Sequence, residues 1–182
     1  MKQCTLCEKA FNFNPGLKGK NADITKLLFV LHRSDTRTFE YFENYWGAFV
    51  NSATGVILDR MLKKADLDLP DIYITNLFKC LLPKNSRPSS EQYQNCLKIF
   101  EQQVRTFEPR AMVVFGNMSY KYIFQGKYSK HKITDVSGQV LSYNGIPCLV
   151  SIHPSQIWKK INPELQEPYI RKIAKFLKAN KQ

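Results

Sequence analysis

The stretch Asp71-Ile-Tyr-Ile-Thr-Asn-Leu-Phe-Lys-Cys80 decides the fold, because an apolar run leads here directly into polar and thiol side chains. Ile72–Thr75 has the unalternating texture of a strand that is buried on both faces. Three further runs have the same character, at Leu27–Leu31, Met112–Phe115 and Leu149–Ile152. We predict four strands from these runs. In such folds ligands bind beyond the carboxyl ends of the strands, where Cys80 stands.

Helical patterns separate the predicted strands. Apolar residues recur at helical spacing from Ile57 to Ala65 and again from Tyr93 to Phe107. The second pattern opens with Ser89-x-x-Gln92, a capping box, and stops before Pro109. Both stretches are therefore predicted to be helices with one apolar face.

Two more helices complete the pattern. We expect a short one after Gly116 and a last one over roughly 165–177, with Pro168 tolerated only in its first turn. Four alternations of strand and helix predict a parallel sheet between two helical layers. The expected fold is α/β, a three-layer α/β/α sandwich with a central four-stranded parallel sheet. No internal repeat marks a second domain, so we expect a single domain over residues 1–182.

The composition is that of a folded, basic protein. Hydrophobic residues make up 43% of the 182 residues, which is enough for a full core. Lys and Arg total 27 against 15 Asp and Glu, and a net charge of +12 raises the affinity for polyanions such as nucleic acid. Neither a signal-peptide-like start nor a bilayer-length apolar run occurs. We expect a monomeric cytoplasmic protein that binds nucleic acid and no membrane.

Four of the five cysteines form a candidate metal site: Cys4, Cys7, Cys80 and Cys96. In a reducing compartment such thiols bind metal more often than they form disulfides. Four thiolates suit a structural zinc ion, and they suit a [4Fe–4S] cluster equally well. The fifth, Cys148, lies in an apolar strand and is expected to be a core residue.

Several short motifs occur in the order found in one enzyme family. They are Thr75-Asn76-x-x-Lys79-Cys80, Pro83-x-Asn85-x-Arg87-Pro88, Glu108-Pro109-Arg110 before Met112-Val-Val-Phe-Gly116, Gly145-Ile-Pro147, and His153-Pro154-Ser155. With the cysteines, they make the chain resemble the iron–sulfur (family 4-like) uracil-DNA glycosylases from Cys4 to about Lys160. The resemblance implies a uracil-DNA glycosylase-like fold and a [4Fe–4S] cluster on the four cysteines. It also implies an enzyme that flips a pyrimidine such as uracil out of DNA and hydrolyses its N-glycosidic bond.

The resemblance also assigns a base pocket. Phe49 matches the residue whose ring stacks on the flipped base, and Asn76 matches the side chain that pairs with its Watson–Crick edge. His153 matches the residue that hydrogen-bonds the pyrimidine O2 while negative charge develops there. From the residues alone, a core Phe, a turn-forming Asn and a strand-end His remain the alternatives.

DNA-contacting residues follow from the same match. The run Gln156–Lys160 matches the family's loop that enters the DNA groove. Ile157 or Trp158 would wedge into the gap left by the base, and Lys159 and Lys160 would meet phosphate. Packing of Trp158 on the last helix is the alternative. Further candidates for phosphate contact, or simply for solvation, are Lys79, Lys84 and Arg87.

The chain departs from the family after its first predicted strand. The family's Gly-Glu-Ala-Pro-Gly motif positions the attacking water, and here Leu31-His32-Arg33-Ser34-Asp35 replaces it. His32 or Asp35 is then the candidate for water positioning, and His32 is also a candidate nucleophile. Alternatively, the loop fits a base enlarged at C5, or hydrolysis has lapsed and a DNA-binding protein remains. A zinc-stabilised nucleic-acid module is the last alternative.

Overall fold

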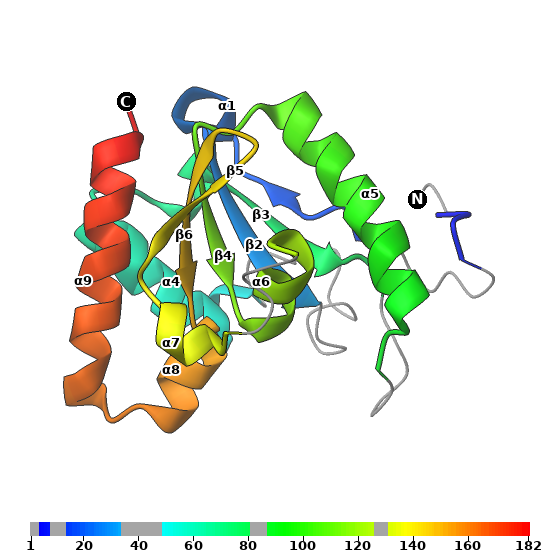
Figure 1. Cartoon of the computed structure of the whole chain (residues 1–182). Helices are drawn as coiled ribbons and strands as arrows, with labels where there is room; N and C mark the ends of the chain where they lie inside the picture. Colours follow the sequence, from blue (N-terminus) through cyan, green and yellow to red (C-terminus); the bar gives the residue numbers. More distant parts are fainter. Residues whose placement is uncertain (1–3, 8–13, 34–48, 81–86, 126–130) are drawn as a thin grey trace.

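Residues 4–7, 14–33, 49–80, 87–125 and 131–182 are described by a computed structural model of the chain (Figure 1). At its centre lies a six-stranded sheet in the order β1-β3-β2-β4-β6-β5. Its four inner strands are parallel: β3 (Ile72–Phe78), β2 (Leu27–Arg33), β4 (Ala111–Phe115) and β6 (Ile146–Ser151). They contain the four predicted runs, except that β6 ends at Ser151, one residue before Ile152, so the prediction of a central four-stranded parallel sheet is confirmed.

The two edge strands are antiparallel and were not predicted. β1 (Leu17–Lys18) pairs with β3, and β5 (Val140–Tyr143) pairs with β6. Asn144 and Gly145 join β5 to β6 with φ angles of 51° and 85°. Positive φ at both residues is typical of the tight turns that close a two-residue hairpin.

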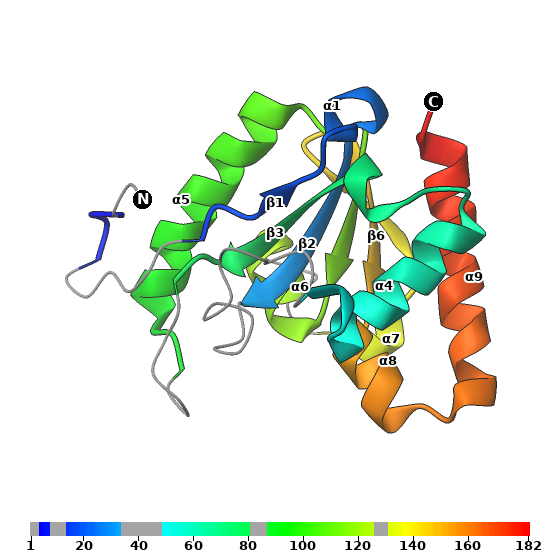
Figure 2. The same cartoon turned by 180° about the vertical axis from the view of Figure 1, so that it is seen from behind.

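Helices cover both faces of the sheet, as the α/β/α prediction requires. α4 (Ala53–Lys64), α8 (Pro154–Lys160) and α9 (Pro163–Asn180) pack together on one face, where α4 contacts both of the others (Figures 1 and 2). α5 (Ser90–Phe107) and α6 (Asn117–Ile123) lie on the other face. Shorter elements complete the chain: α1 (Ala22–Thr25), the 3-10 helix η2 (Leu69–Asp71) and α7 (Ile133–Val136). Within the described ranges, every helix is too short or too polar to span a bilayer.

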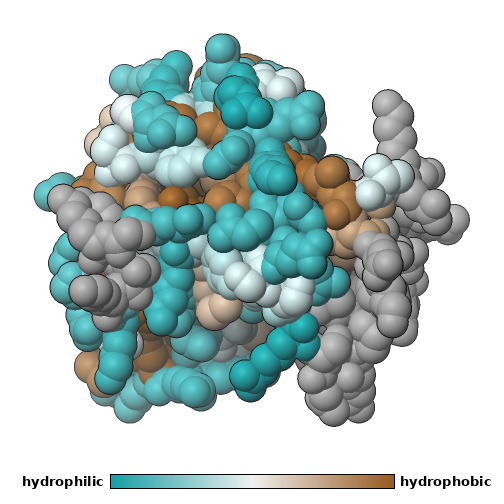
Figure 3. Space-filling view, turned by 45° about the vertical axis from the view of Figure 1, so that its right-hand side comes forward, coloured by the Kyte–Doolittle hydropathy of each residue, from teal (hydrophilic) through white to brown (hydrophobic). Residues whose placement is uncertain are grey.

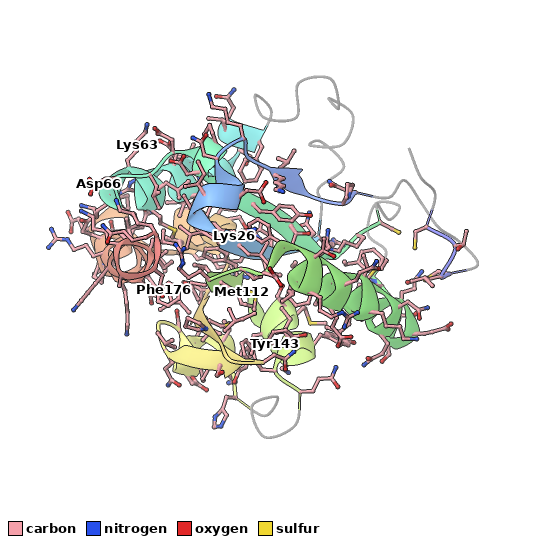
Figure 4. All side chains as sticks on the ribbon, turned by 90° about the horizontal axis from the view of Figure 1, so that it is seen from above. Lys26, Lys63, Asp66, Met112, Tyr143 and Phe176 are labelled. Atoms are coloured by element: carbon pink, nitrogen blue, oxygen red, sulfur yellow. The ribbon has the colours of Figure 1, made fainter. Side chains whose placement is uncertain are left out.

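The core lies between the sheet and the apolar faces of these helices. Seen from above, Met112 of β4 lies in the middle of the molecule and Phe176 lies on α9 beside it (Figure 4). Met112 is fully buried, as are Leu58 of α4 and Phe100 of α5 on opposite faces. Cys148 is also fully buried, which confirms its prediction as a core residue.

The last helix differs from its prediction. α9 begins at Pro163, so Pro168 lies inside the helix instead of in its first turn. An interior proline removes one backbone hydrogen bond, but packing can outweigh that loss. Pro168 lies on the exposed side, while Ile170, Ile173 and Leu177 are buried against the rest of the protein.

The parallel strands bring several candidate residues to one edge of the sheet. His32 is near the end of β2, Cys80 follows β3, Gly116 follows β4 and His153 follows β6. Register places Arg33 opposite Phe78 and Phe115 opposite Ser151, so these strand ends are neighbours. α1 precedes β2 and therefore lies at the opposite edge.

Candidate functional site

Four cysteines line one cavity beside the end of β3. Cys4, Cys7, Cys80 and Cys96 surround a small space that is partly open to solvent. The other residues around it are Leu6, Phe78, Gln92, Asn95 and Ile99. Figure 3, which turns the α5 side of the molecule forward, shows hydrophobic surface on that side. Among the described residues that line the cavity, the four cysteines supply thiols and the others are apolar or amide side chains.

The thiols share the cavity without closing on a single metal ion. Among the described residues, no three or more His, Cys, Asp or Glu side chains form a group that could hold one ion. Burial raises the pKa of the Cys96 thiol, while a hydrogen bond from the Lys79 amide, 3.5 Å from Cys96 Sγ, lowers it. Cys7 and Cys4 raise the pKa of Cys96 further, because neighbouring thiolates repel one another.

A hydrogen-bond network attaches the N-terminal segment to β3 and α5. Gln103 Nε2 donates to the Pro15 carbonyl at 2.6 Å and to the Tyr73 hydroxyl at 2.8 Å. The Tyr73 hydroxyl in turn donates to the Pro15 carbonyl at 3.0 Å, and Asn14 N donates to the Lys79 carbonyl at 2.8 Å. These contacts fix Asn14 and Pro15, directly before β1, against β3 and α5.

Lys79 belongs to this network and not to a DNA-binding surface. Its side chain is fully buried, and Nζ donates to Thr75 Oγ1 at 2.6 Å and to Gln103 Oε1. Burial lowers the pKa of Lys79 to about 7. The hypothesis that Lys79 contacts phosphate is therefore wrong, because the ammonium group does not reach the surface.

His153 lies at the N-terminus of α8 as its capping residue. The backbone N–H of Ser155 donates to His153 Nδ1 at 3.3 Å, and Ser155 Oγ lies 2.8 Å from the same nitrogen. Burial, with His32 nearby, lowers the pKa of His153 to about 4, so the ring is neutral at pH 7. Because Nδ1 accepts a hydrogen bond, the single ring proton belongs on Nε2, which makes Nε2 a hydrogen-bond donor.

His32 is held by a tyrosine from α5. His32 Nε2 is hydrogen-bonded to the Tyr93 hydroxyl, and the two rings are nearly parallel at 11°, with centroids 5.8 Å apart. Tyr93 itself stacks on Tyr122 of α6, with centroids 4.2 Å apart. Burial lowers the pKa of His32 to about 4, with the charge of Arg33 contributing. A general base works best with a pKa near the operating pH, so His32 is suited to accept a hydrogen bond and poorly suited to take a proton.

Asn76 and Phe49 are both buried, each with 5% of its surface exposed. Asn76 lies in β3 opposite Leu31, one residue before the level of His32. Phe49 precedes α4, and its carbonyl accepts from Ser52 N at 3.0 Å and from Ser52 Oγ at 2.7 Å. That Phe49, Asn76 and His153 enclose one base pocket stays a prediction.

The two wedge candidates are neighbours on helix α8 and differ in exposure. Ile157 is fully buried, so it does not present a side chain to DNA, and that half of the prediction is wrong. Trp158 is 48% exposed, and Lys159 and Lys160 are exposed in the last turn of the helix. Arg87 is exposed as well. These four side chains remain available for DNA.

Two candidates lie outside the described residues, namely Asp35 and Lys84.

Two residues that contribute to the site were not predicted from the sequence. Tyr93 was counted only toward the apolar stripe of its helix, although a buried tyrosine usually has a partner for its hydroxyl. Gln103 gave no signal of its own, since a glutamine on a half-buried helix face is ordinary.

Comparisons with known proteins agree with the resemblance. Residues 14–178 match the family model described as the uracil DNA glycosylase superfamily. A type-4 uracil-DNA glycosylase of Thermotoga maritima is 26% identical over 96% of this chain and 88% of its own length. One of Archaeoglobus fulgidus is 25% identical over 92% of this chain and 82% of its own. A type-5 uracil-DNA glycosylase of Pyrobaculum aerophilum is 31% identical over 47% of this chain and 37% of its own.

Proposed function

The chain belongs to the uracil-DNA glycosylase superfamily, and we propose that it is a DNA glycosylase that removes uracil or a related pyrimidine from DNA. The observation that carries this proposal is the state of His153. A neutral imidazole with its proton on Nε2, fixed by a helix terminus at the carboxyl edge of the sheet, is a preorganised donor for a developing anion.

The reaction breaks the bond between the sugar C1′ and the pyrimidine N1. The bond's electron pair leaves with the base, and the resulting charge is shared by the pyrimidine O2. Nε2–H of His153 would donate to that oxygen, and this hydrogen bond strengthens as the charge grows. Such an interaction accelerates the reaction because it favours the transition state over the ground state.

Recognition of the base would fall to Asn76 and Phe49. The amide of Asn76 offers both a donor and an acceptor, which suits the O4 and N3–H of uracil. The ring of Phe49 would stack on the flipped base. Support for these roles comes from the family motifs and from the place of Asn76 on the strand next to β2.

Water would add to C1′ on the side of the sugar away from the leaving base. His32 is proposed to orient this water as a hydrogen-bond acceptor, because its low pKa disfavours full proton transfer. Asp35 remains the candidate for the proton acceptor. The covalent role considered for His32 has no further support.

The cysteine cavity fits the [4Fe–4S] cluster that the resemblance implies. Four thiols and an otherwise largely apolar lining match the donor set of such a cluster, in which each cysteine binds a different iron. Cys4, Cys7, Cys80 and Cys96 would hold it. Bound there, the cluster would supply a cross-link between the N-terminal segment, the end of β3 and α5.

The proposed site would be completed by the DNA-facing residues. Trp158, which is exposed, would fill the gap left by a flipped base, and Lys159, Lys160 and Arg87 would contact phosphate. Such an enzyme acts on DNA in the cytoplasm, and we expect it to be a monomer.

Activity is tested with single-stranded and double-stranded oligonucleotides that each carry one modified base. The panel contains uracil, 5-hydroxymethyluracil, hypoxanthine and bulkier C5-modified pyrimidines. We expect abasic sites at uracil or at a C5-modified pyrimidine. Binding without abasic-site formation on any member would instead identify a DNA-binding protein that has lost hydrolysis.

Metal content is tested separately. Protein purified without oxygen is expected to be brown, to absorb broadly near ~400 nm, and to contain about four irons and four sulfides per chain. A colourless preparation with one zinc per chain would overturn the cluster and favour the zinc alternative.

A further inference from the structure

We propose that Tyr93 is a positioning residue for His32: its phenolic oxygen accepts a hydrogen bond from Nε2–H and leaves Nδ1 as the acceptor that orients the attacking water. The inference deepens the proposed function and rests on it. Tyr93 belongs to α5 and contacts His32, a residue of the segment that replaces the family motif, and Tyr93 would itself touch neither water nor DNA.

The geometry around Tyr93 is well defined. Its side chain is only 3% exposed, and its hydroxyl is hydrogen-bonded to His32 Nε2. The Tyr93 ring is held on one side by Tyr122, at a centroid distance of 4.2 Å and an angle of 18°. Phe78 of β3 meets it edge-on, with centroids 5.7 Å apart. A phenol enclosed in this way has little freedom to move away from His32.

The proposed direction of the hydrogen bond, from His32 Nε2–H to the Tyr93 oxygen, is the one that a water-orienting imidazole requires. A neutral imidazole has one N–H and one lone-pair nitrogen. If Tyr93 donated to Nε2, the ring proton would sit on Nδ1, and His32 could only donate to a water. A water that accepts a hydrogen bond from Nδ1–H commits one of its two lone pairs to that bond and becomes a weaker nucleophile. With Nε2–H donating to Tyr93, Nδ1 accepts an O–H from the water, which keeps both lone pairs free and becomes a stronger nucleophile toward C1′.

Tyr93 also connects this site to the cysteine cavity. Cys96 follows Tyr93 on α5 after less than one helical turn, and Gln92 and Asn95 line the cavity beside it. Any group that fixes Cys96 therefore fixes the helix that holds His32. His32, which stands where the family has its acidic motif, is thus hydrogen-bonded by the same helix that carries Cys96 of the candidate metal site.

The test compares Tyr93→Phe with Tyr122→Phe, in the cluster-loaded protein. Both variants lose one phenolic oxygen from the same stacked pair, but only Tyr93 is hydrogen-bonded to His32. Under single-turnover conditions on the accepted base, we expect Tyr93→Phe to lower the rate about tenfold, as for loss of one hydrogen bond. The DNA dissociation constant and the iron content should not change, and Tyr122→Phe should stay within about twofold of the parent.

Two further readouts separate positioning from general damage. In a His32→Ala background, Tyr93→Phe should have no additional effect, because the pathway through His32 is already lost. Long-range ¹H–¹⁵N NMR of the histidine rings should show His32 protonated at Nε2 in the parent and a mixture of tautomers in Tyr93→Phe.

Each outcome decides the inference. Additive rate effects of the two substitutions, or a parent His32 protonated at Nδ1, would overturn it. If the parent protein forms no abasic site on any base, the proposed glycosylase function fails, and the NMR result alone then decides whether Tyr93 fixes His32.

Discussion

At the residue scale, the proposed chemistry depends most on His153. Replacing it by Ala removes the Nε2 donor, and loss of one such donor typically costs about 10²–10³-fold in rate. We expect that loss in single-turnover cleavage, with DNA affinity nearly unchanged. His131→Ala is the matched control, because His131 is exposed and outside the site. An unchanged rate in His153→Ala would exclude His153 from the mechanism.

The same histidine makes the fold sensitive to acid. Burial lowers the pKa of His153 to about 4 in the folded chain, against 6.5 for an ordinary histidine, so below pH 6.5 the unfolded chain binds more protons. Folding stability should therefore fall as pH decreases from about 6.5 toward 4, by up to about 1.4 kcal/mol per pH unit for this residue. We expect the thermal midpoint to drop between pH 7 and pH 5, and to drop less in His153→Gln. Equal drops in both proteins would contradict the buried neutral state.

At the scale of elements, Gln103 of α5 joins three segments. It donates to the Pro15 carbonyl and to Tyr73 of β3, and it accepts from Lys79 and Thr75. Gln103→Ala should release the N-terminal segment, because the buried Lys79 ammonium also loses a partner. We expect faster loss of iron and of absorbance near ~400 nm on exposure to a chelator. Gln102→Ala, at the exposed neighbouring position, should retain iron like the parent, and equal iron loss in the two variants would refute the role of Gln103.

The elements that could be predicted are those with long, strongly patterned sequences. The four inner strands are buried on both faces, so their uninterrupted apolar runs were sufficient to predict them. α5 could be predicted because it has both an apolar stripe and a capping box. β1 has two residues, too few for any pattern. The hairpin of β5 was signalled by Asn144-Gly145 and was overlooked. The start of α9 was predicted too late because Pro168 was expected in the first turn, whereas packing outweighs the local propensity of proline and the helix begins at Pro163.

Only those parts of the candidate site that lie at strand ends or in recognisable motifs could be predicted from the sequence. His32 and His153 were placed at the correct edge because parallel strands all end there. The burial of Lys79 and Ile157 could not be predicted, since it depends on neighbours distant in sequence: Lys79 Nζ is hydrogen-bonded to Gln103 of α5, and Ile157 belongs to α8, which packs on α4. The hydrogen bond of the Tyr93 hydroxyl could not be predicted either. A helical stripe predicts which face of the helix is buried, and not which polar partner a hydroxyl on that face will contact.

At the scale of the whole molecule, the charge of +12 should act mainly where DNA contacts the carboxyl edge of the sheet. Lys159→Ala combined with Lys160→Ala removes two exposed cations from α8. If both contact phosphate, the slope of log K against log salt should become shallower by about 2, since each phosphate contact contributes roughly 0.9.

The matched control removes two exposed cations from the opposite edge, Lys20→Ala with Lys63→Ala. Lys20 precedes α1, and Lys63 lies in the last turn of α4 before β3 begins, so both lie at the amino ends of the strands. The net charge falls equally in the two double variants. Only the α8 variant should change the slope in a fluorescence-anisotropy titration, because counterion release depends on contacts and not on total charge. Equal slopes in both variants would show that α8 does not contact the DNA backbone.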